Sequence, residues 1–440
     1  MMRMKTIYLS VILLLVLPLC RLGNIALADE KAELRQAEAY DKNGQDKEAE
    51  AAYTKIVIDY AGTEWAVKAQ RGLATMYIIR GKYPKAEEAV KKLTVELRES
   101  PGAAEAIYRV ADMYRMMEKH SEAKSLYRYV AEQYPQDAYA YAIWGQMYVV
   151  ICDFYLGNEE DAQLEIDELK EAFAGDSSLP TVLCVIGQQC RQLQIYEQAR
   201  NLFRYVQDTW PENEYATWAQ RDMVILEIEA GDDSASQAAL DKLLSKFSDA
   251  WGLPRAVYDI AVAFQWKAGN RQKADELFGY VVDKWTKADN PTWVQVQCVA
   301  MANIALGNDT AAQAAIDRLI ESFREEPRVP RAVYEIAAEC YYPQGETYQS
   351  QGDVNEASKF FQNAIAVLNR IIVDLPQGTY TPWAYYLTAQ CYQKLNEYDK
   401  AVECLKKIVK DYPDYDYAWD AQFMIDNRVK ELTTINRNPR

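Results

Sequence analysis

Histidine is nearly absent from this chain: His120 is the single one among 440 residues. A metal cage of several histidines is therefore excluded, and a triad that needs a histidine base could use only this residue. Its place in a predicted turn before Ala123 favours a structural role. Glycine-rich phosphate loops, the nucleophile elbow and the zinc-protease motif are also missing. Acidic residues are too numerous for counting to exclude an acid–base pair, but repeats fill the chain and leave no room for a catalytic domain. We expect no enzyme activity, no cofactor and no metal.

Long apolar runs are also missing, apart from a short one near the start. Residues 7–19 are mostly apolar and follow two basic residues, and Ala26-Leu27-Ala28 matches a small-residue cleavage site. We interpret 1–28 as a signal peptide cleaved after Ala28, which predicts an exported protein. An uncleaved anchor and a lipoprotein signal that uses Cys20 are the alternatives. No later segment is long and apolar enough to span a membrane.

Basic residues are outnumbered, 49 against 65 acidic ones, which gives a formal net charge of −16. An acidic surface repels nucleic acid and anionic lipid, so we expect no nucleic-acid partner. It favours basic or neutral partners, although solubility alone explains the same composition.

Cysteine is sparse and follows no metal-ligand or redox spacing. Seven cysteines lie beyond the signal segment, none in a C-x-x-C pair, and most fall in apolar helical stretches. There a cysteine acts as a small core residue, so we predict mostly reduced packing cysteines. One disulfide within the fifth or tenth repeat stays open if the compartment is oxidising.

What the chain does contain is one pattern repeated ten times. A small residue is followed by apolar residues four and seven positions later and, in most copies, by an aromatic eleven positions later, which is one face of a helix. We call the small residue position zero. The ten are Ala49, Ala86, Ala123, Ala162, Ala199, Ser236, Ala274, Ala312, Ala357 and Ala401. A period of 37 to 45 residues is typical of a solenoid.

Each copy is predicted to be a helix–turn–helix hairpin. A second apolar helical stretch precedes position zero, and glycine often stands five residues before it, as at Gly81 and Gly231. Glycine there supplies the left-handed backbone of a helix C-cap. Proline follows the aromatic directly at Pro135, Pro211 and Pro413, which predicts the end of the second helix.

These hairpins resemble the tetratricopeptide repeat, over residues 30 to 435. Its small–small–Tyr signature is matched at Leu73-Ala74 with Tyr77, and its second-helix alanine is position zero. The resemblance implies an all-α fold, a right-handed α-solenoid of about ten repeats. The longer period and the Tyr134-Pro135 type of ending are similar to bacterial envelope repeat proteins, such as the outer-membrane assembly lipoproteins and the Tol–Pal coordinator. That implies a periplasmic or outer-membrane-associated protein.

The ninth repeat departs from the rest by seven extra residues in each helix. We therefore predict repeats 1–8 at 29–326, repeats 9–10 at 327–414, and a capping helix with a tail at 415–440. The lengthened hairpin predicts a docking finger or a hinge, with a tolerated insertion as the alternative. Pro343 and Gly345 should kink or interrupt its first arm.

In this family the first helices line the concave face, and the resemblance transfers its groove positions to this chain. Arginine with tyrosine or tryptophan there is typical of an interface hot spot. The candidates are Tyr108, Asp112, Arg115, Gln188, Arg191, Trp218, Arg221, Asp259, Trp266, Lys267, Trp383, Tyr386 and Gln390.

We therefore predict a non-enzymatic exported scaffold that holds a protein or peptide partner in its groove. The resemblance to envelope repeat proteins implies a role in assembly of the cell envelope. The alternative is a carbohydrate-binding solenoid, in which Trp266 and Trp383 stack on the sugar rings of a secreted or wall polysaccharide.

Overall fold

The computed structural model describes residues 30–135, 141–376 and 378–413, together with residues 415, 418, 421–422 and 424–425. The predicted signal peptide and most of the predicted capping helix lie outside these residues. The chain divides into two compact units, of which the first ends at Val206 and the second begins at Gln207. Each unit is described by itself. The predicted boundary between 326 and 327 rests on hairpin length alone and stays a prediction.

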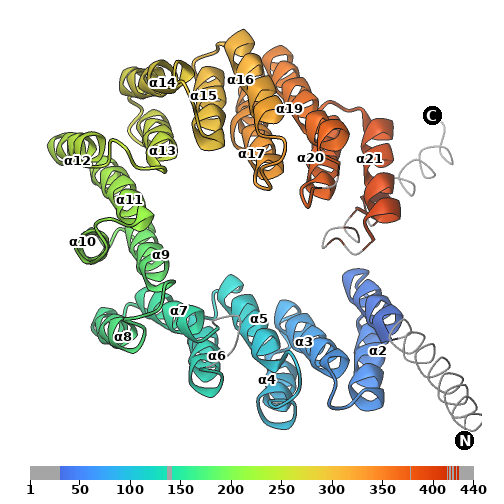
Figure 1. The fold of residues 1–440 in the computed structure, drawn as a ribbon. Helices are drawn as coiled ribbons and strands as arrows, with labels where there is room; N and C mark the ends of the chain where they lie inside the picture. Colours follow the sequence, from blue (N-terminus) through green and yellow to red (C-terminus); the bar gives the residue numbers. More distant parts are fainter. Residues whose placement is uncertain are drawn as a thin grey trace, which may run out of the picture. The chain divides into compact units, whose positions relative to one another are not determined.

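Unit 1 is a row of helix hairpins (Figure 1). A first helix covers residues 30–42. The helices that follow are α2 (Asp46–Asp59), α3 (Glu64–Ile79), α4 (Tyr83–Lys91), the π-helical segment η1 (Lys92–Glu96), α5 (Ala103–Met116), α6 (His120–Gln133), α7 (Tyr141–Leu156), α8 (Glu159–Ala172), α9 (Leu179–Gln192) and α10 (Tyr196–Thr209), which crosses the boundary.

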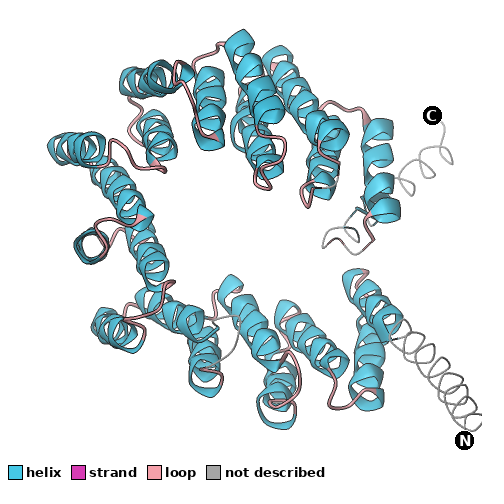
Figure 2. Ribbon diagram, viewed as in Figure 1, coloured by secondary structure: helices cyan, strands magenta, loops and turns pink. Residues whose placement is uncertain are grey.

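Unit 2 continues the same pattern. It contains α11 (Glu214–Ala230), α12 (Asp233–Lys246), α13 (Leu253–Trp266), α14 (Arg271–Thr286), α15 (Trp293–Ala305), α16 (Asp309–Ser322), α17 (Val329–Glu335), the π-helical segment η2 (Ile336–Tyr341), α18 (Tyr342–Ser350), α19 (Val354–Asp374), α20 (Thr381–Lys394) and α21 (Tyr398–Asp411). All regular structure in the described part of the chain is helical (Figure 2), which confirms the all-α repeat fold.

The predicted repeat register is confirmed by burial. All ten residues at position zero are at most 3 % exposed, and all ten at position seven are buried as well. Position four is fully buried in nine repeats, with rings such as Tyr127, Phe203 and Phe278. The exception, Val90, is half-buried and lies just before η1, where the helix widens.

Position eleven is less uniformly buried than positions zero, four and seven. Tyr60, Tyr134 and Tyr412, the C-cap residues of α2, α6 and α21, are only half-buried. Phe247 is also a C-cap residue, at the end of α12, and yet it is buried, as is Trp285 within α14. The end of the helix therefore does not by itself decide whether this side chain reaches solvent.

A left-handed residue joins the two helices of every hairpin. Seven are the predicted glycines, and the remaining three are Glu118, Gln194 and Asn396, with φ between 59° and 83° over the whole set. The turn therefore has one geometry in all ten repeats of the described chain, whether or not its residue is glycine. Left-handed backbone is costly for a residue with a Cβ, and least so for asparagine.

Repeat 9 is lengthened as predicted. Helix α19 has 21 residues, whereas α12 and α16 have 14. Its first arm stays helical through Pro343, which lies in the first turn of α18, but π-helical η2 precedes it and interrupts the α geometry. Proline is tolerated at a helix start because its missing N–H has no partner there.

The two faces of each unit differ in how tightly their helices pack. First helices contact the next first helix along the chain, as in α3 with α5 and α11 with α13, whereas consecutive second helices make few or no close backbone contacts. The first helices therefore form the inner side of each unit's curve. We call this the first-helix face, and the opposite side the second-helix face.

The seven cysteines of the described chain are free, and all but Cys404 are buried. Burial raises the pKa of Cys190 and of Cys391 to about 12, so both stay thiols at neutral pH. These observations support packing roles and show no disulfide in repeat 5 or 10. Among the described helices, none has both the length and the apolar composition required to cross a membrane.

The turn geometry generates a first prediction. Gln194→Gly should raise the free energy of unfolding by about 0.5–1 kcal/mol. Glycine removes the strain of the left-handed backbone, and the greater conformational freedom of glycine in the unfolded chain offsets part of that gain. Asn396→Gly should gain less, and Gly231→Ala should lose stability. Chemical denaturation midpoints test the order. A Gln194→Gly midpoint below that of the original chain would contradict it.

The helix contact within repeat 5 generates a second prediction. A Cβ on Gly187 would lie 2.6 Å from the ring of Phe203, which is fully buried. Gly187→Ala should therefore cost about 1–3 kcal/mol through overpacking. Adding Phe203→Leu should recover part of that loss, because leucine vacates the space beside the new methyl group. Equal denaturation midpoints for Gly187→Ala and the double variant would contradict the packing argument.

Candidate functional site

The thirteen predicted groove residues are divided between the two units. Tyr108, Asp112 and Arg115 lie on α5, with Gln188 and Arg191 on α9. The other eight lie on or beside first helices of unit 2. All thirteen lie on or directly beside first helices, but their surroundings differ strongly.

Four tyrosines from three helices form the centre of the unit 1 surface, and we call them the tyrosine cluster. They are Tyr108 of α5, Tyr127 of α6, and Tyr141 and Tyr148 of α7. The Tyr108 ring centroid lies 5.3 Å from Tyr127, 5.3 Å from Tyr141 and 6.0 Å from Tyr148. Tyr108 meets Tyr127 and Tyr148 edge to face, and Tyr127 stacks on Tyr148 at 4.8 Å. Both arrangements stabilise aromatic clusters beyond simple burial.

Arg115 is held at the edge of this cluster. Its guanidinium lies 4.8 Å from the Tyr148 ring centroid, and its Nε donates to the Tyr127 hydroxyl at 3.3 Å. The same hydroxyl donates to Asp112 Oδ1 at 2.6 Å. Burial opposes the charge, but the Tyr127 hydrogen bond and nearby groups leave the pKa of Arg115 above its ordinary value. The arginine therefore stays charged and oriented, with 31 % of its side chain still exposed.

Sequence reasoning missed the tyrosines of α7. Tyr141, Tyr148 and Tyr155 stand seven residues apart, so they share one helix face, and this spacing was the signal available. Tyr155 is 41 % exposed, stacks on His120 at 4.5 Å and donates weakly to Gln189 at 3.4 Å. His120 is the first residue of α6, and burial lowers its pKa.

Exposed apolar side chains continue this surface. Ile79, Met116 and Tyr155 stand at the same position, seven residues before position zero in consecutive repeats, and are 48 %, 68 % and 41 % exposed. Gln188 and Arg191 of α9 are half-buried at the next repeat along. Aligned exposed apolar groups of this kind mark protein-interaction surfaces.

In unit 2, Arg221 is not available as a free anchor. It donates to both oxygens of Asp222 and to Asp259 Oδ2 at 3.0 Å, and it stacks on Trp218 at 4.9 Å. Only 17 % of its side chain is exposed. Neighbouring carboxylates already accept hydrogen bonds from its guanidinium, so a partner would have to compete with them, and its role in binding stays a prediction.

Asp259 belongs to a longer charged row on the first-helix face. Arg255 donates to Asp259 at 2.8 Å and to Glu339 at 2.6 Å. Burial raises the pKa of Glu339 above its ordinary value, against the lowering effect of Arg255. This row ties α13 to η2 and serves the packing of unit 2.

The remaining candidates do not form one site. Trp266 is 58 % exposed, and Lys267 beside it pairs with Glu229 at 3.5 Å. Trp383 packs between Tyr334 and Tyr415 at 6.4 Å and 5.2 Å. Tyr386 packs on the C-terminal core, and Gln390 is half-buried on the same helix. Trp266, at the end of α13, is exposed, whereas Trp383 of α20 packs against the aromatic rings of Tyr334 and Tyr415.

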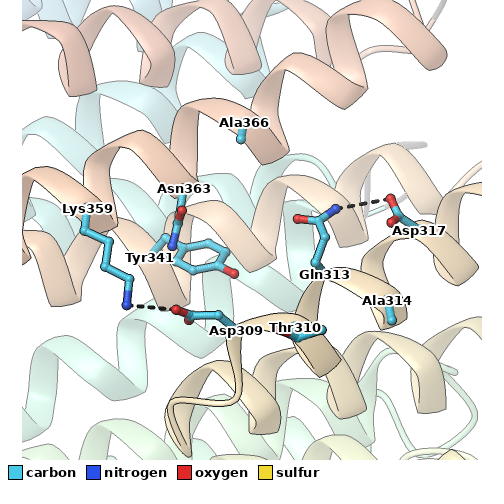
Figure 3. A pocket seen from close by; sticks show the side chains of 9 residues that line it. All are labelled: Asp309, Thr310, Gln313, Ala314, Asp317, Tyr341, Lys359, Asn363 and Ala366. Atoms are coloured by element: carbon cyan, nitrogen blue, oxygen red, sulfur yellow. Dashed lines mark hydrogen bonds and ion pairs between the residues drawn. The ribbon is translucent and has the colours of Figure 1, made fainter.

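A hollow of about 550 Å³ lies on the second-helix face of unit 2, between α16 and α19 (Figure 3). Sequence reasoning did not predict it. Its lining residues are Asp309, Thr310, Gln313, Ala314, Asp317, Tyr341, Lys359, Asn363 and Ala366. No group of three or more His, Cys, Asp or Glu side chains is arranged to hold a metal ion in the part of the chain that the structure describes.

Comparisons with known proteins agree on the repeat. One sequence model of the tetratricopeptide repeat matches residues 336–414, and a second matches residues 31–63 and 105–137. A search of curated proteins found no match.

Solved structures that resemble the chain include a tetratricopeptide repeat protein from Parabacteroides merdae, at 12 % identity and a TM-score of 0.29, over 64 % of this chain and 97 % of that one. The apo form of RapI shares 13 % identity at a TM-score of 0.32, and the match covers 78 % of this chain and 98 % of RapI. PilW, described as a widely conserved type IV pilus biogenesis factor, shares 11 % identity at a TM-score of 0.27. The match covers 56 % of this chain and 99 % of PilW. Similarity at this level supports no inference about function.

The helix hairpins, their buried small residues and the matched segments agree with one another. The segments at 31–63, 105–137 and 336–414 are tetratricopeptide repeats, helical hairpins that generally act as non-catalytic scaffolds for protein or peptide partners.

Proposed function

We propose that this protein is a non-enzymatic adaptor that binds a protein or peptide partner on the first-helix face of unit 1. The observation that carries the proposal is the tyrosine cluster with Arg115. Tyrosine and arginine dominate interface hot spots because they combine large contact area with directed hydrogen bonds. Here the cluster holds Arg115 in place before a partner arrives, which lowers the entropy lost on binding.

The surface has the arrangement that a helical or extended partner segment needs. Met116 follows Arg115 on α5, and Tyr155 lies two turns beyond Tyr148 on α7; both are exposed, while Asp112 and Arg115 provide hydrogen-bonding groups. Methionine is flexible and polarisable, so it adapts to the shape of a partner. Apolar contacts flanked by fixed polar groups give both affinity and orientation.

We further propose that the protein acts outside the cytoplasm, in assembly of the cell envelope. The support is the sequence of residues 1–28, which has the charge, apolar run and cleavage site of a secretory signal. An acidic chain with a net charge of −16 is suited to basic or neutral protein partners.

A capture experiment tests the adaptor proposal. We expect Tyr148→Ala with Arg115→Gln to reduce recovery of the partner at least about tenfold, because hot-spot truncation costs about 2 kcal/mol or more. Recovery is measured by affinity purification of tagged protein from its own cells after mild crosslinking, with quantitative mass spectrometry. Lys85→Gln is the control, since it removes an exposed ion pair with Glu50 on the second-helix face. Equal recovery by both variants, with circular dichroism unchanged, would refute the assignment.

The export proposal has its own test. The N-terminal peptide of the protein from its own cells should begin at Asp29, and the protein should be in the periplasmic fraction. Mass spectrometry of protein N-termini provides the measurement. A chain that retains residues 1–28 in the cytoplasmic fraction would contradict export. Retention in a membrane fraction would indicate an anchor, and a lipid on Cys20 would indicate a lipoprotein.

A further inference from the structure

We propose that the hollow between α16 and α19 binds a neutral, hydroxyl-rich ligand: a short oligosaccharide, free or at the end of a longer glycan. This site is on the second-helix face of unit 2 and is independent of the partner surface in unit 1. Four properties of its lining support the assignment: its origin, its charge balance, its unpaired polar groups and its closed ends.

The origin of the hollow is the lengthened ninth repeat. Elsewhere, short polar contacts join consecutive second helices, such as Gln198 Nε2 to Gln163 Oε1 at 2.8 Å. Between α16 and α19, the longer helix displaces these contacts toward the two ends. Lys359 reaches Asp309 at 2.8 Å at one end, and Arg370 reaches Asp317 at the other. The space between is left unfilled, and the small residues Ala314 and Ala366 line it.

The charges of the hollow are balanced. Asp309 pairs with Lys359 in the lining, and Asp317 pairs with Arg370 just outside it, so each carboxylate of the lining already has a basic partner on α19. A phosphate would meet the two carboxylates, and an ammonium group would have to compete with the basic partner that each carboxylate already has. The balance therefore favours a neutral ligand.

Neutral hydrogen-bonding groups converge on the centre. Tyr341 lies between the two helices, with the carboxamides of Gln313 and Asn363 on opposite walls (Figure 3). Gln313 donates to Asp317 at 3.1 Å, which leaves its carbonyl oxygen for a ligand. The Tyr341 hydroxyl and the Asn363 carboxamide make no hydrogen bond within the described part of the chain. Each carboxamide both donates and accepts, as does a phenol hydroxyl.

The closed ends distinguish a compact ligand from a peptide that runs through the site. The bridging ion pairs stand on Asp309 and Asp317, eight residues or about 12 Å apart along α16. A peptide strand that continued past either end would have to break an ion pair. The volume of about 550 Å³ is in the range of small-ligand sites, which is about 300–1,000 Å³.

A sugar meets these conditions together. Each of its hydroxyl groups donates one hydrogen bond and accepts others, so neighbouring hydroxyls can pair with the carboxamides, the phenol and the carboxylate oxygens at once. Its C–H groups can contact Ala314 and Ala366. The ligand is neutral and short enough to fit between the two ion pairs.

The test uses the purified full chain, fluorescently labelled, on an array of neutral oligosaccharides. We expect retention on at least one glycan, and about tenfold weaker affinity for Asn363→Leu and for Tyr341→Phe, because each loses a hydrogen bond. Tyr341→Phe keeps the buried ring, so the fold is preserved, and thermal melting confirms this for both variants. Titration with the same oligosaccharide free in solution distinguishes a free ligand from a chain end.

Matched variants make the result specific. Gln198→Leu removes a carboxamide contact between the second helices α8 and α10, away from the lining of the hollow, and it should leave glycan affinity unchanged. Trp266→Ala should also have no effect. The proposal is overturned by no retention on any neutral glycan, by retention that Asn363→Leu and Tyr341→Phe leave intact, or by loss with Trp266→Ala instead. Retention on a peptide array that depends on Asn363 would identify a peptide site and overturn it too.

Discussion

The close approach of two helices at position zero is the contact on which the rest of the structure depends. An alanine or serine there is fully buried, so the facing helix can lie against its backbone. The side chain at position four, an aromatic ring in half of the repeats, then fills the space beside position zero, as Phe203 does over Gly187. A larger side chain at either place would separate the helices. The left-handed turn five residues earlier fixes the angle at which the chain returns.

One hairpin cannot bury both of its apolar faces, so its stability comes from its neighbours. Residues at the same position of consecutive repeats meet across the first-helix face. Arg221 and Asp259 both stand fifteen residues before position zero, and they pair at 3.0 Å. Gln297, at the same position in the eighth repeat, donates to Glu335 at 2.8 Å. The repeat period thus sets the ion pairs of unit 2 as well as its core.

The period, the hairpins and the length of the ninth repeat could be read from the sequence, because burial recurs at fixed intervals. The left-handed turns at Glu118 and Gln194 could not, since neither residue favours that backbone by itself. They adopt it because the hairpins on both sides impose the turn. The ion pair between Arg221 and Asp259 of the next repeat could not be predicted either, because the repeat positions give the helix of each residue but not its side-chain partner.

The first-helix faces of the two units use their arginines differently, and this determines where each can bind. In unit 2, arginines of the first-helix face are paired with carboxylates, because an acidic chain has few basic groups and each one stabilises several acids. A partner gains little from groups already satisfied. Arg115 differs, since its contacts are phenol rings, a hydroxyl and one distant carboxylate. Its charge is oriented without being neutralised, so the tyrosine cluster can attract a partner that the charged row of unit 2 cannot.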